Sequence, residues 1–314
     1  MIRLGLIGGR GHVGQELLQL LDGSAHYRVV FAGSRSRAGQ PVRDEFPGLQ
    51  TDLVFSGVER ETIGAAETDA WILAQDNGQA AGFVEMLEDR PGPVVDVSAD
   101  HRFDPDWVYG LTQMNADQLP DARRVANPGC YATAIQLGLL PILDWLDESP
   151  PTAFGVSGYS GAGRKPGPRN DPRRLADNLI PYQLAGHLHQ REASHHLGRP
   201  VRFAPHVAGF FRGISITLMA RLAEPRTAGE IAGRFREVCL DWPLVDISDP
   251  PPEIAMVRET GLTRIGGFTL DPCDSSCLVW TSVLDNLRKG AASQVVENLN
   301  LIFGLPWQTE LEGD

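Results

Sequence analysis

The chain begins Met1-Ile2-Arg3-Leu4-Gly5-Leu6-Ile7 and continues directly into Gly8-Gly9-Arg10-Gly11-His12-Val13-Gly14. The apolar first stretch predicts a β-strand, and the residues after the second stretch predict a helix. Between them, Gly8, Gly11 and Gly14 form a G-x-x-G-x-x-G variant of the dinucleotide-binding turn. Glycines let the backbone approach a pyrophosphate, and the amides of a helix N-terminus favour an anion. The opening therefore predicts nucleotide binding, with a plain glycine turn as the alternative.

The chain has 314 residues, which corresponds to two domains of ~150 residues each. In the residues before Cys130, short β-rich runs alternate with helical stretches, a pattern typical of a parallel sheet with helices on both faces. The strands expected there are Leu4–Ile7, Arg28–Ala32, Ala70–Ala74 and Val94–Val97, and the helices are Gln15–Leu21 and Gly78–Leu87.

After Cys130 the β-rich runs are longer, which favours an α+β domain. Strands are expected at Thr152–Val156, Val201–Ala204, Gly213–Leu222, Ile254–Val257 and Cys277–Leu284, and helices at Ala132–Leu146, Ala228–Leu240 and Leu287–Phe303. The fold class predicted is α/β, with a Rossmann-type parallel sheet domain and an α+β domain on a mixed, largely antiparallel sheet. We expect residues 1–129, completed by a C-terminal helix over 286–314, to form the first domain, and residues 130–285 to form the second.

Composition excludes several classes of protein. Apolar residues make up 42% and charged residues 22%, as in ordinary globular proteins. With 28 Lys and Arg against 40 Asp and Glu, the net charge of −12 disfavours nucleic-acid binding, which needs a basic surface. The longest apolar run is too short to span a bilayer, and four cysteines are too few for a disulfide scaffold. We expect a cytoplasmic protein without a metal site, and Cys273 and Cys277 to lie on a strand.

The end of the second expected strand bears on cofactor choice. NAD enzymes usually place an acidic residue there for the ribose 2′-hydroxyl. Here Ser34 and Arg35 occupy that place, and their hydroxyl and guanidinium groups suit a 2′-phosphate. This favours NADP over NAD, with a solvated basic loop as the alternative.

Cys130 follows the turn-forming residues Pro128 and Gly129 and precedes an expected helix. Amides at a helix N-terminus stabilise a thiolate, so a cysteine in this place is a candidate nucleophile. From the spacing alone, a buried structural cysteine is an equal alternative.

Two histidines lie close together in Gly186-His187-Leu188-His189-Gln190-Arg191-Glu192. On a helix, His189 and Glu192 share a face, so the carboxylate would orient the imidazole, while His187 would point elsewhere. The spacing differs from that of zinc-binding helices.

Two further segments carry polar groups suited to an anionic substrate. His206 and Arg212 flank a turn before a strand, where Arg212 would bind a carboxylate or phosphate, with a surface ion pair as the alternative. The glycine-rich loop Ser157–Arg164 offers backbone donors and one fixed cation.

Several strings together resemble the N-acetyl-γ-glutamyl-phosphate reductase family of the aspartate-semialdehyde dehydrogenase superfamily. They run nearly end to end: Gly8–Gly14, Asp96–Arg102, Tyr109–Leu111, Asn127–Tyr131, Ser160–Arg164, His189 with Glu192, Pro205-His206, Arg212–Ile214 and Asp285–Gln294. Ala132, Thr112, Gln113 and Ala193 depart from the family pattern, in which Pro, Pro, Glu and Ile are usual.

The resemblance implies NADPH-dependent reduction of an acyl phosphate to an aldehyde in arginine biosynthesis, by a homodimer or homotetramer that releases inorganic phosphate. It implies that residues 1–129 with the helix over 286–314 bind NADP, and that residues 130–285 form the catalytic, substrate and dimerisation domain. It also implies Cys130 as nucleophile and His189 as acid and base. The cofactor residues would be Gly8, Gly11, His12, Val13, Gly14, Ser34, Arg35, Gly161, Ala162 and Asn286. The substrate residues would be Asn127, Ser160, Arg164, Glu192, His206 and Arg212. Aspartyl phosphate and a carrier-bound aminoadipyl phosphate are alternative substrates, and an inactive NADP-binding regulator is a third alternative.

Overall fold

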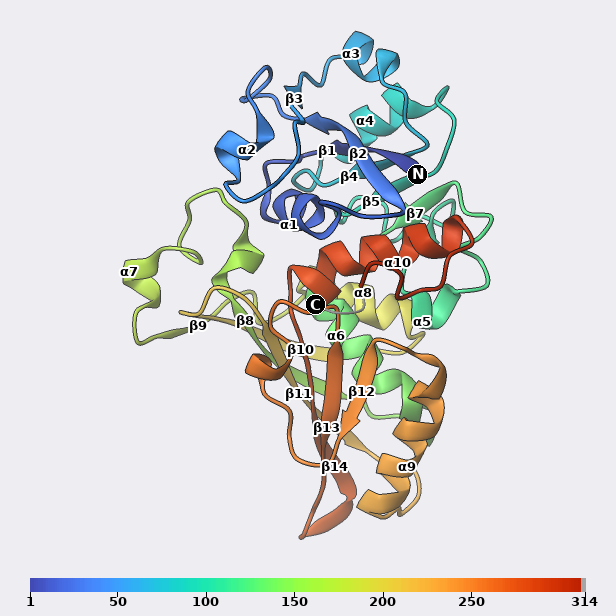
Figure 1. The fold of residues 1–314 in the computed structure, drawn as a ribbon. Coiled ribbons are helices and arrows are strands. Elements are labelled where there is room, and N and C mark those ends of the chain that lie inside the picture. The colour runs from blue at the N-terminus through green and yellow to red at the C-terminus, as the bar shows by residue number, and fades with distance from the viewer. Residues whose placement is uncertain (312–314) are drawn as a thin grey trace. The chain divides into compact units, whose positions relative to one another are not determined.

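The computed structural model describes residues 1–311 of the chain and divides them into two compact units. The first comprises Met1–Pro128 together with the described residues from Ala291 onward, and the second comprises Gly129–Gly290. Figure 1 shows each unit built around a sheet of its own.

The first unit contains a parallel seven-stranded sheet in the order β3-β2-β1-β4-β5-β7-β6. Its strands are β1 (Ile2–Ile7), β2 (Tyr27–Gly33), β3 (Phe55–Ser56), β4 (Ala70–Leu73), β5 (Val94–Asp96), β6 (Val108–Tyr109) and β7 (Arg124–Ala126). Its helices are α1 (His12–Leu20), α2 (Val42–Glu45), α3 (Arg60–Ala65), α4 (Ala80–Leu87), α5 (Thr112–Asn115) and α10 (Ser293–Ile302). The strand order reverses at β1, which is where such sheets bind a ligand. The Rossmann-type sheet is confirmed.

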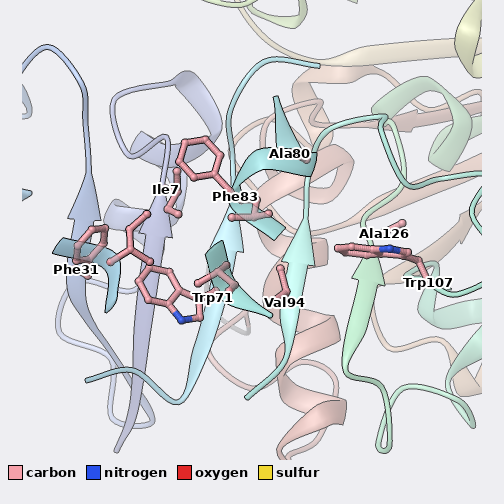
Figure 2. Close-up of a cluster of buried hydrophobic side chains, with 11 residues drawn as sticks. Ile7, Phe31, Trp71, Ala80, Phe83, Val94, Trp107 and Ala126 are labelled. Atoms are coloured by element: carbon pink, nitrogen blue, oxygen red, sulfur yellow. The ribbon is translucent and has the colours of Figure 1, made fainter. Parts of the chain in front are cut away.

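An apolar cluster joins one face of this sheet to α3 and α4 (Figure 2). The ring of Trp71 on β4 lies 5.2 Å from that of Phe31 on β2, edge to face. The Trp71 ring also packs directly against Gly5 of β1. A Cβ atom on Gly5 would lie 2.4 Å from the Trp71 ring. The absence of a side chain at Gly5 thus makes room for the indole ring of Trp71.

The second unit contains a mixed seven-stranded sheet in the order β12-β13-β14-β11-β8-β10-β9, in which β8–β10 and β12–β13 pair in parallel and the other neighbours antiparallel. Its strands are β8 (Thr152–Gly158), β9 (Leu179–Pro181), β10 (Arg202–Ala208), β11 (Ile214–Arg221), β12 (Val245–Ser248), β13 (Thr263–Asp271) and β14 (Asp274–Leu284). Its α-helices are α6 (Cys130–Leu139), α7 (Pro172–Leu175), α8 (Leu188–His196) and α9 (Ala228–Val238). The 3₁₀ turns are η1 (Leu140–Trp145), η2 (Tyr159–Ala162), η3 (Cys239–Asp241) and η4 (Ile254–Met256). The expected mixed, largely antiparallel sheet is confirmed.

Helices α6 and α9 cover one face of the second sheet. The indole of Trp280 on β14 donates to the carbonyl of Gly138 in α6 over 2.8 Å, and Phe235 of α9 lies 6.4 Å from the Trp280 ring. A Cβ atom on Gly138 would come within 2.3 Å of Leu218 on β11, so the helix approaches the sheet closely. This packing holds α6 against the sheet.

Four expected elements differ from the structure. The helix expected over Ala132–Leu146 ends at Leu139 and gives way to η1, and the strand expected at Ile254–Val257 is the 3₁₀ turn η4. The helix expected over 286–314 begins as a π-turn, η5 (Arg288–Ala292), and α10 ends at Ile302; the last three residues of that range lie outside the described part. Only one cysteine of the Cys273 and Cys277 pair lies on a strand, because Cys273 sits in the turn before β14.

Candidate active site

The glycine turn lies at the carboxyl end of β1, at the reversal point of the first sheet. Gly8 has φ of +89°, and a Cβ atom there would lie 2.4 Å from the carbonyl oxygen of Ala74. A Cβ atom on Gly14 would lie 2.5 Å from the carbonyl oxygen of Gly8. Gly11 is the N-cap of α1, and no side chain at this position caps the nine-residue helix. The turn fits a pyrophosphate, which amides at a helix N-terminus bind.

A basic corner adjoins the turn at the end of β2. Ser34 is buried, while Arg35 holds its guanidinium 5.7 Å from the ring of Phe83. Both Arg35 and Phe83 line a pocket of about 310 Å³, together with Val58, Glu59, Gln79, Gly82 and Met86. Nearby, Arg10 and Arg37 both pair with Glu45. A flat apolar wall beside fixed cations fits the adenosine end of a nicotinamide dinucleotide, although the carboxylate of Glu59 lies in the same pocket.

In the second unit, Cys130 is the first residue of α6. Gly129 is the N-cap and has extended backbone, with φ of −76° and ψ of 148°. The Cys130 side chain is partly exposed. A thiol at the first position of a ten-residue helix lies in the positive potential of the helix dipole, which favours the thiolate.

Gly290, in the turn η5, lies directly against this cysteine. A Cβ atom on Gly290 would lie 2.6 Å from the Cβ of Cys130 and 3.1 Å from its Cα. Neither atom is the end of a flexible side chain, so any substitution must move the backbone of one segment or the other.

We therefore expect Gly290→Ala to lower turnover by on the order of 100-fold, the effect of displacing a reacting group by about 1 Å. It should also destabilise the fold by roughly 1–3 kcal/mol through overpacking. Steady-state kinetics and urea unfolding measure the two effects. Gly233→Ala is the matched control, because Gly233 of α9 has no atom within 4 Å of its Cβ position. Full turnover in Gly290→Ala would show that this contact does not hold Cys130.

Helix α8 brings two of the expected residues to the nucleophile. Glu192 is fully buried, and its Oε1 accepts a 2.7 Å hydrogen bond from the amide of Gly129, the residue before Cys130. His189 lies one turn earlier on α8, with its ring 5.9 Å from that of Tyr131, the residue after Cys130. Thus Glu192 fixes the loop before Cys130 while His189 lies beside the residue after it.

His187 is the N-cap of α8 rather than a member of the helix, so it does not face away from His189 as expected. Burial lowers the pKa of His187 to about 4, and the positive charge of Arg169 acts in the same direction. Burial also raises the pKa of Tyr182 to about 12, and negative charge at Cys130 contributes to this rise. Tyr182 and His187, which lie beside the cysteine, are therefore uncharged near pH 7.

Several expected cofactor and substrate residues gather at the ends of β8 and β11. The Asn286 side chain donates to Ser160 Oγ over 2.9 Å and accepts from the amide of Gly213 over 2.7 Å. A Cβ atom on Gly161 would lie 3.8 Å from the Asn286 amide nitrogen. Arg212 donates to both oxygens of Asp285, over 2.6 Å and 3.2 Å, and is 9% exposed. The ion pair weighed for Arg212 is thus present, but it is buried rather than on the surface.

The structure also places the other expected substrate residues His206, Arg164 and Asn127. On β10, Phe203 contacts Tyr131 and His187, so His206, three positions on, projects from the opposite face and contacts Phe154. Arg164 is exposed after η2. Asn127 lies in the first unit, where its side chain accepts from Asn298.

Sequence reasoning missed Gly290, Tyr182 and Asp285 as residues of the site. Gly290 and Asp285 belong to the Asp285–Gln294 string named in the sequence analysis. A glycine just before an expected helix could have indicated that the backbone approaches another segment closely there. Tyr182 has no such signal, because only the fold brings β9 to the cysteine. Within residues 1–311, no group of three or more His, Cys, Asp or Glu is placed to hold a metal ion. No helix of this part is long and apolar enough to cross a membrane.

Known protein families match both units. Residues 3–122 match the semialdehyde dehydrogenase NAD binding domain, and residues 130–286 match the semialdehyde dehydrogenase dimerisation domain. The chain is therefore an oxidoreductase of the semialdehyde dehydrogenase class with a nicotinamide-cofactor domain.

Relatives that match this chain over nearly its whole length identify one family within this class. A protein of Xanthomonas oryzae pv. oryzae named N-acetyl-gamma-glutamyl-phosphate reductase is 44% identical over 304 residues, which cover 96% of this chain and 95% of its own. A reductase of the same name from Stenotrophomonas maltophilia is 43% identical and covers 98% of this chain and 97% of its own. The chain belongs to the N-acetyl-gamma-glutamyl-phosphate reductase family.

Solved structures share the fold. An aspartate semialdehyde dehydrogenase II of Vibrio cholerae superposes with a TM-score of 0.79 at 16% identity, covering 97% of this chain and 98% of its own. An aspartate semialdehyde dehydrogenase of Candida albicans, solved with NADP, gives 0.76 at 15% identity, covering 96% of this chain and all of its own.

Proposed function

We propose that the protein reduces N-acetyl-γ-glutamyl phosphate to N-acetylglutamate semialdehyde with NADPH, releasing inorganic phosphate, in the biosynthesis of arginine. The observation that carries the proposal is Cys130 at the first position of α6, braced by Glu192 from the helix that also carries His189. Relatives above 40% identity over nearly the whole chain bear the name of this reaction.

Cys130 begins the reaction as a thiolate that attacks the acyl carbonyl carbon. The C–O bond to the phosphate then breaks, the phosphate leaves with the electron pair, and a thioester remains on the sulfur. Amides at the start of α6 would donate to the oxyanion of the tetrahedral intermediate. Covalent capture splits one difficult step into two.

His189 supplies and removes the proton in the second half. When bound, a reduced nicotinamide supplies the hydride that reduces the thioester carbon. His189 donates a proton to the developing alkoxide, which gives a thiohemiacetal on Cys130. It then takes the hydroxyl proton back as the C–S bond breaks, so that the aldehyde and the thiolate are released.

Ser160, Arg164 and Arg212 are the residues we assign to the phosphate and carboxylate of the substrate, and Asn127 and His206 stay predictions of substrate contact. Arg212 would act through its guanidinium while paired with Asp285. Glu192 is assigned to the brace on Gly129, and any contact with substrate would be additional.

We assign NADP to the glycine turn and the basic corner. Gly8, Gly11, His12, Val13 and Gly14 would hold the pyrophosphate, as the uncapped start of α1 supports. Ser34 and Arg35 would hold the 2′-phosphate. Gly161, Ala162 and Asn286 of the second unit are predicted to contact the nicotinamide end.

Arg35→Ala should weaken NADPH binding by roughly 10- to 100-fold, as expected for losing a charged hydrogen bond, and leave NADH binding nearly unchanged. Glu59→Gln should shift preference the other way, because its carboxylate would repel a 2′-phosphate in the same pocket. Fluorescence titration of both cofactors measures the effect. Arg43→Ala, which removes an exposed cation paired with Asp52, is the matched control. Equal use of NADH and NADPH by the unmodified protein would refute the assignment.

We infer a cytoplasmic homodimer or homotetramer. The second unit matches a dimerisation domain. The sheet face opposite α6 carries half-exposed Phe154, His206 and Met219, which a second copy would cover.

The test of the proposed function is phosphate-dependent oxidation of N-acetylglutamate semialdehyde with NADP, followed by absorbance of NADPH. Aspartate semialdehyde is the control substrate. Turnover that requires phosphate and prefers the acetylated aldehyde supports the proposal, whereas preference for aspartate semialdehyde would replace it.

A further inference from the structure

Helix α8 begins with an uncommon cap. The Nδ1 atom of His187 accepts a 3.1 Å hydrogen bond from the backbone amide of His189. Most helices use Ser, Thr, Asp or Asn at this position, because their short side chains reach the first free amides. The capped amide here belongs to the very residue assigned to proton transfer.

The cap is also part of a buried aromatic cluster. His187 is 6% exposed, and its ring lies 5.3 Å from Phe203, 5.6 Å from Tyr182 and 6.3 Å from Tyr131. Its ring lies 5.1 Å from the His189 ring. A serine or asparagine would cap the helix but leave this space empty, so the imidazole serves both purposes.

The hydrogen bond requires one charge state. Nδ1 accepts only when it carries no proton, so the ring is neutral with its proton on Nε2. Burial and the charge of Arg169 oppose protonation, while Glu192 favours it. Because the first two effects are larger, the cap is intact at neutral pH, and His187 is a poor proton donor there.

We propose that His187 is a positioning residue, whose neutral imidazole fixes the first turn of α8 and so orients His189 for proton transfer. The inference rests on the proposed function, in which His189 is the acid and base. His187 itself touches no reacting atom in this assignment.

Two variants separate the hydrogen bond from the packing. His187→Phe keeps a flat ring and removes the acceptor, whereas His187→Asn keeps an acceptor and removes the ring. We expect the Phe variant to lose roughly 10- to 100-fold in kcat with an unchanged KM, because His189 is misplaced. The Asn variant should keep most of the kcat of the unmodified protein. His195→Phe, at the exposed end of α8, is the control and should keep full turnover. Full kcat in the Phe variant together with a loss of kcat in the Asn variant would overturn the proposal in favour of packing alone.

A second measurement does not depend on activity. ¹⁵N NMR of the histidine rings in the full chain should find Nδ1 of His187 unprotonated near pH 7 and Nε2 protonated. A protonated Nδ1 would overturn the proposal. If the unmodified protein fails to reduce the acyl phosphate, the proposed function fails, while the spectrum still decides whether His187 caps α8 as a neutral ring.

Discussion

Cys130→Ser should abolish aldehyde formation, lowering turnover on the order of 1,000-fold or more, as loss of a nucleophile does in covalent catalysis. A serine hydroxyl at the start of α6 stays protonated, because the helix dipole is too weak to ionise it. NADP binding should persist, since the glycine turn lies in the other unit. Stopped-flow detection of NADPH consumption, with cofactor titration alongside, measures both.

The other cysteines provide the controls. Burial raises the pKa of Cys239 to about 12, and burial together with Asp274 raises the pKa of Cys277, so neither is a ready nucleophile. Cys273 is exposed in the turn before β14. Each should tolerate serine with most activity kept. Substantial turnover in Cys130→Ser would rule out the thioester mechanism.

His189→Asn should lower kcat by roughly 100- to 10,000-fold, the usual contribution of a positioned general acid and base. Acylation of Cys130 should continue, because phosphate leaves before the proton from His189 is needed. Single-turnover trapping of the thioester by mass spectrometry separates the two halves of the reaction.

His187→Asn should reduce turnover less than His189→Asn, since it keeps a cap for α8. The exposed His195 provides a control on the same helix, and its Asn variant should behave as the unmodified protein. If His187→Asn proves the more damaging of the two in kcat, the roles of His187 and His189 must be exchanged.

The first unit was largely predictable because its signals are local. The strand, glycine turn and helix at Ile2–Leu20 follow one another directly, and the glycines are required by contacts with Ala74 and Gly8. The start of α6 at Cys130 was predictable for the same reason, since Pro128 and Gly129 mark it.

Two of the elements predicted wrongly lie in short apolar runs. The helix after Cys130 ends at Leu139 because Pro141 has no amide hydrogen to continue the helical hydrogen bonds. Ile254–Met256 follows three prolines, and an apolar run of this length is compatible with either a strand or a turn.

Other features of the structure could not be predicted from any local pattern in the sequence. Strand β13 contains Gly266 and Gly267, which break the alternating pattern, and its pairing with β14 shifts register between Gly266 and Thr269. Gly267 has φ of +73°, as expected at a bulge. The cap at His187 was hidden because histidine is an uncommon N-cap, and the brace from Glu192 to Gly129 joins residues that only the fold brings together.

The division of the chain also bears on how the protein is made. The second unit is one continuous segment, whereas the first needs α10, whose residues from Ser293 to Asn300 are all buried. During translation the second unit can close as soon as Gly290 has left the ribosome. The parallel sheet must wait for α10 with apolar surface exposed, although it was synthesised first. We therefore expect that, in nascent chains arrested before Ala291, a chaperone binds the first unit and not the second.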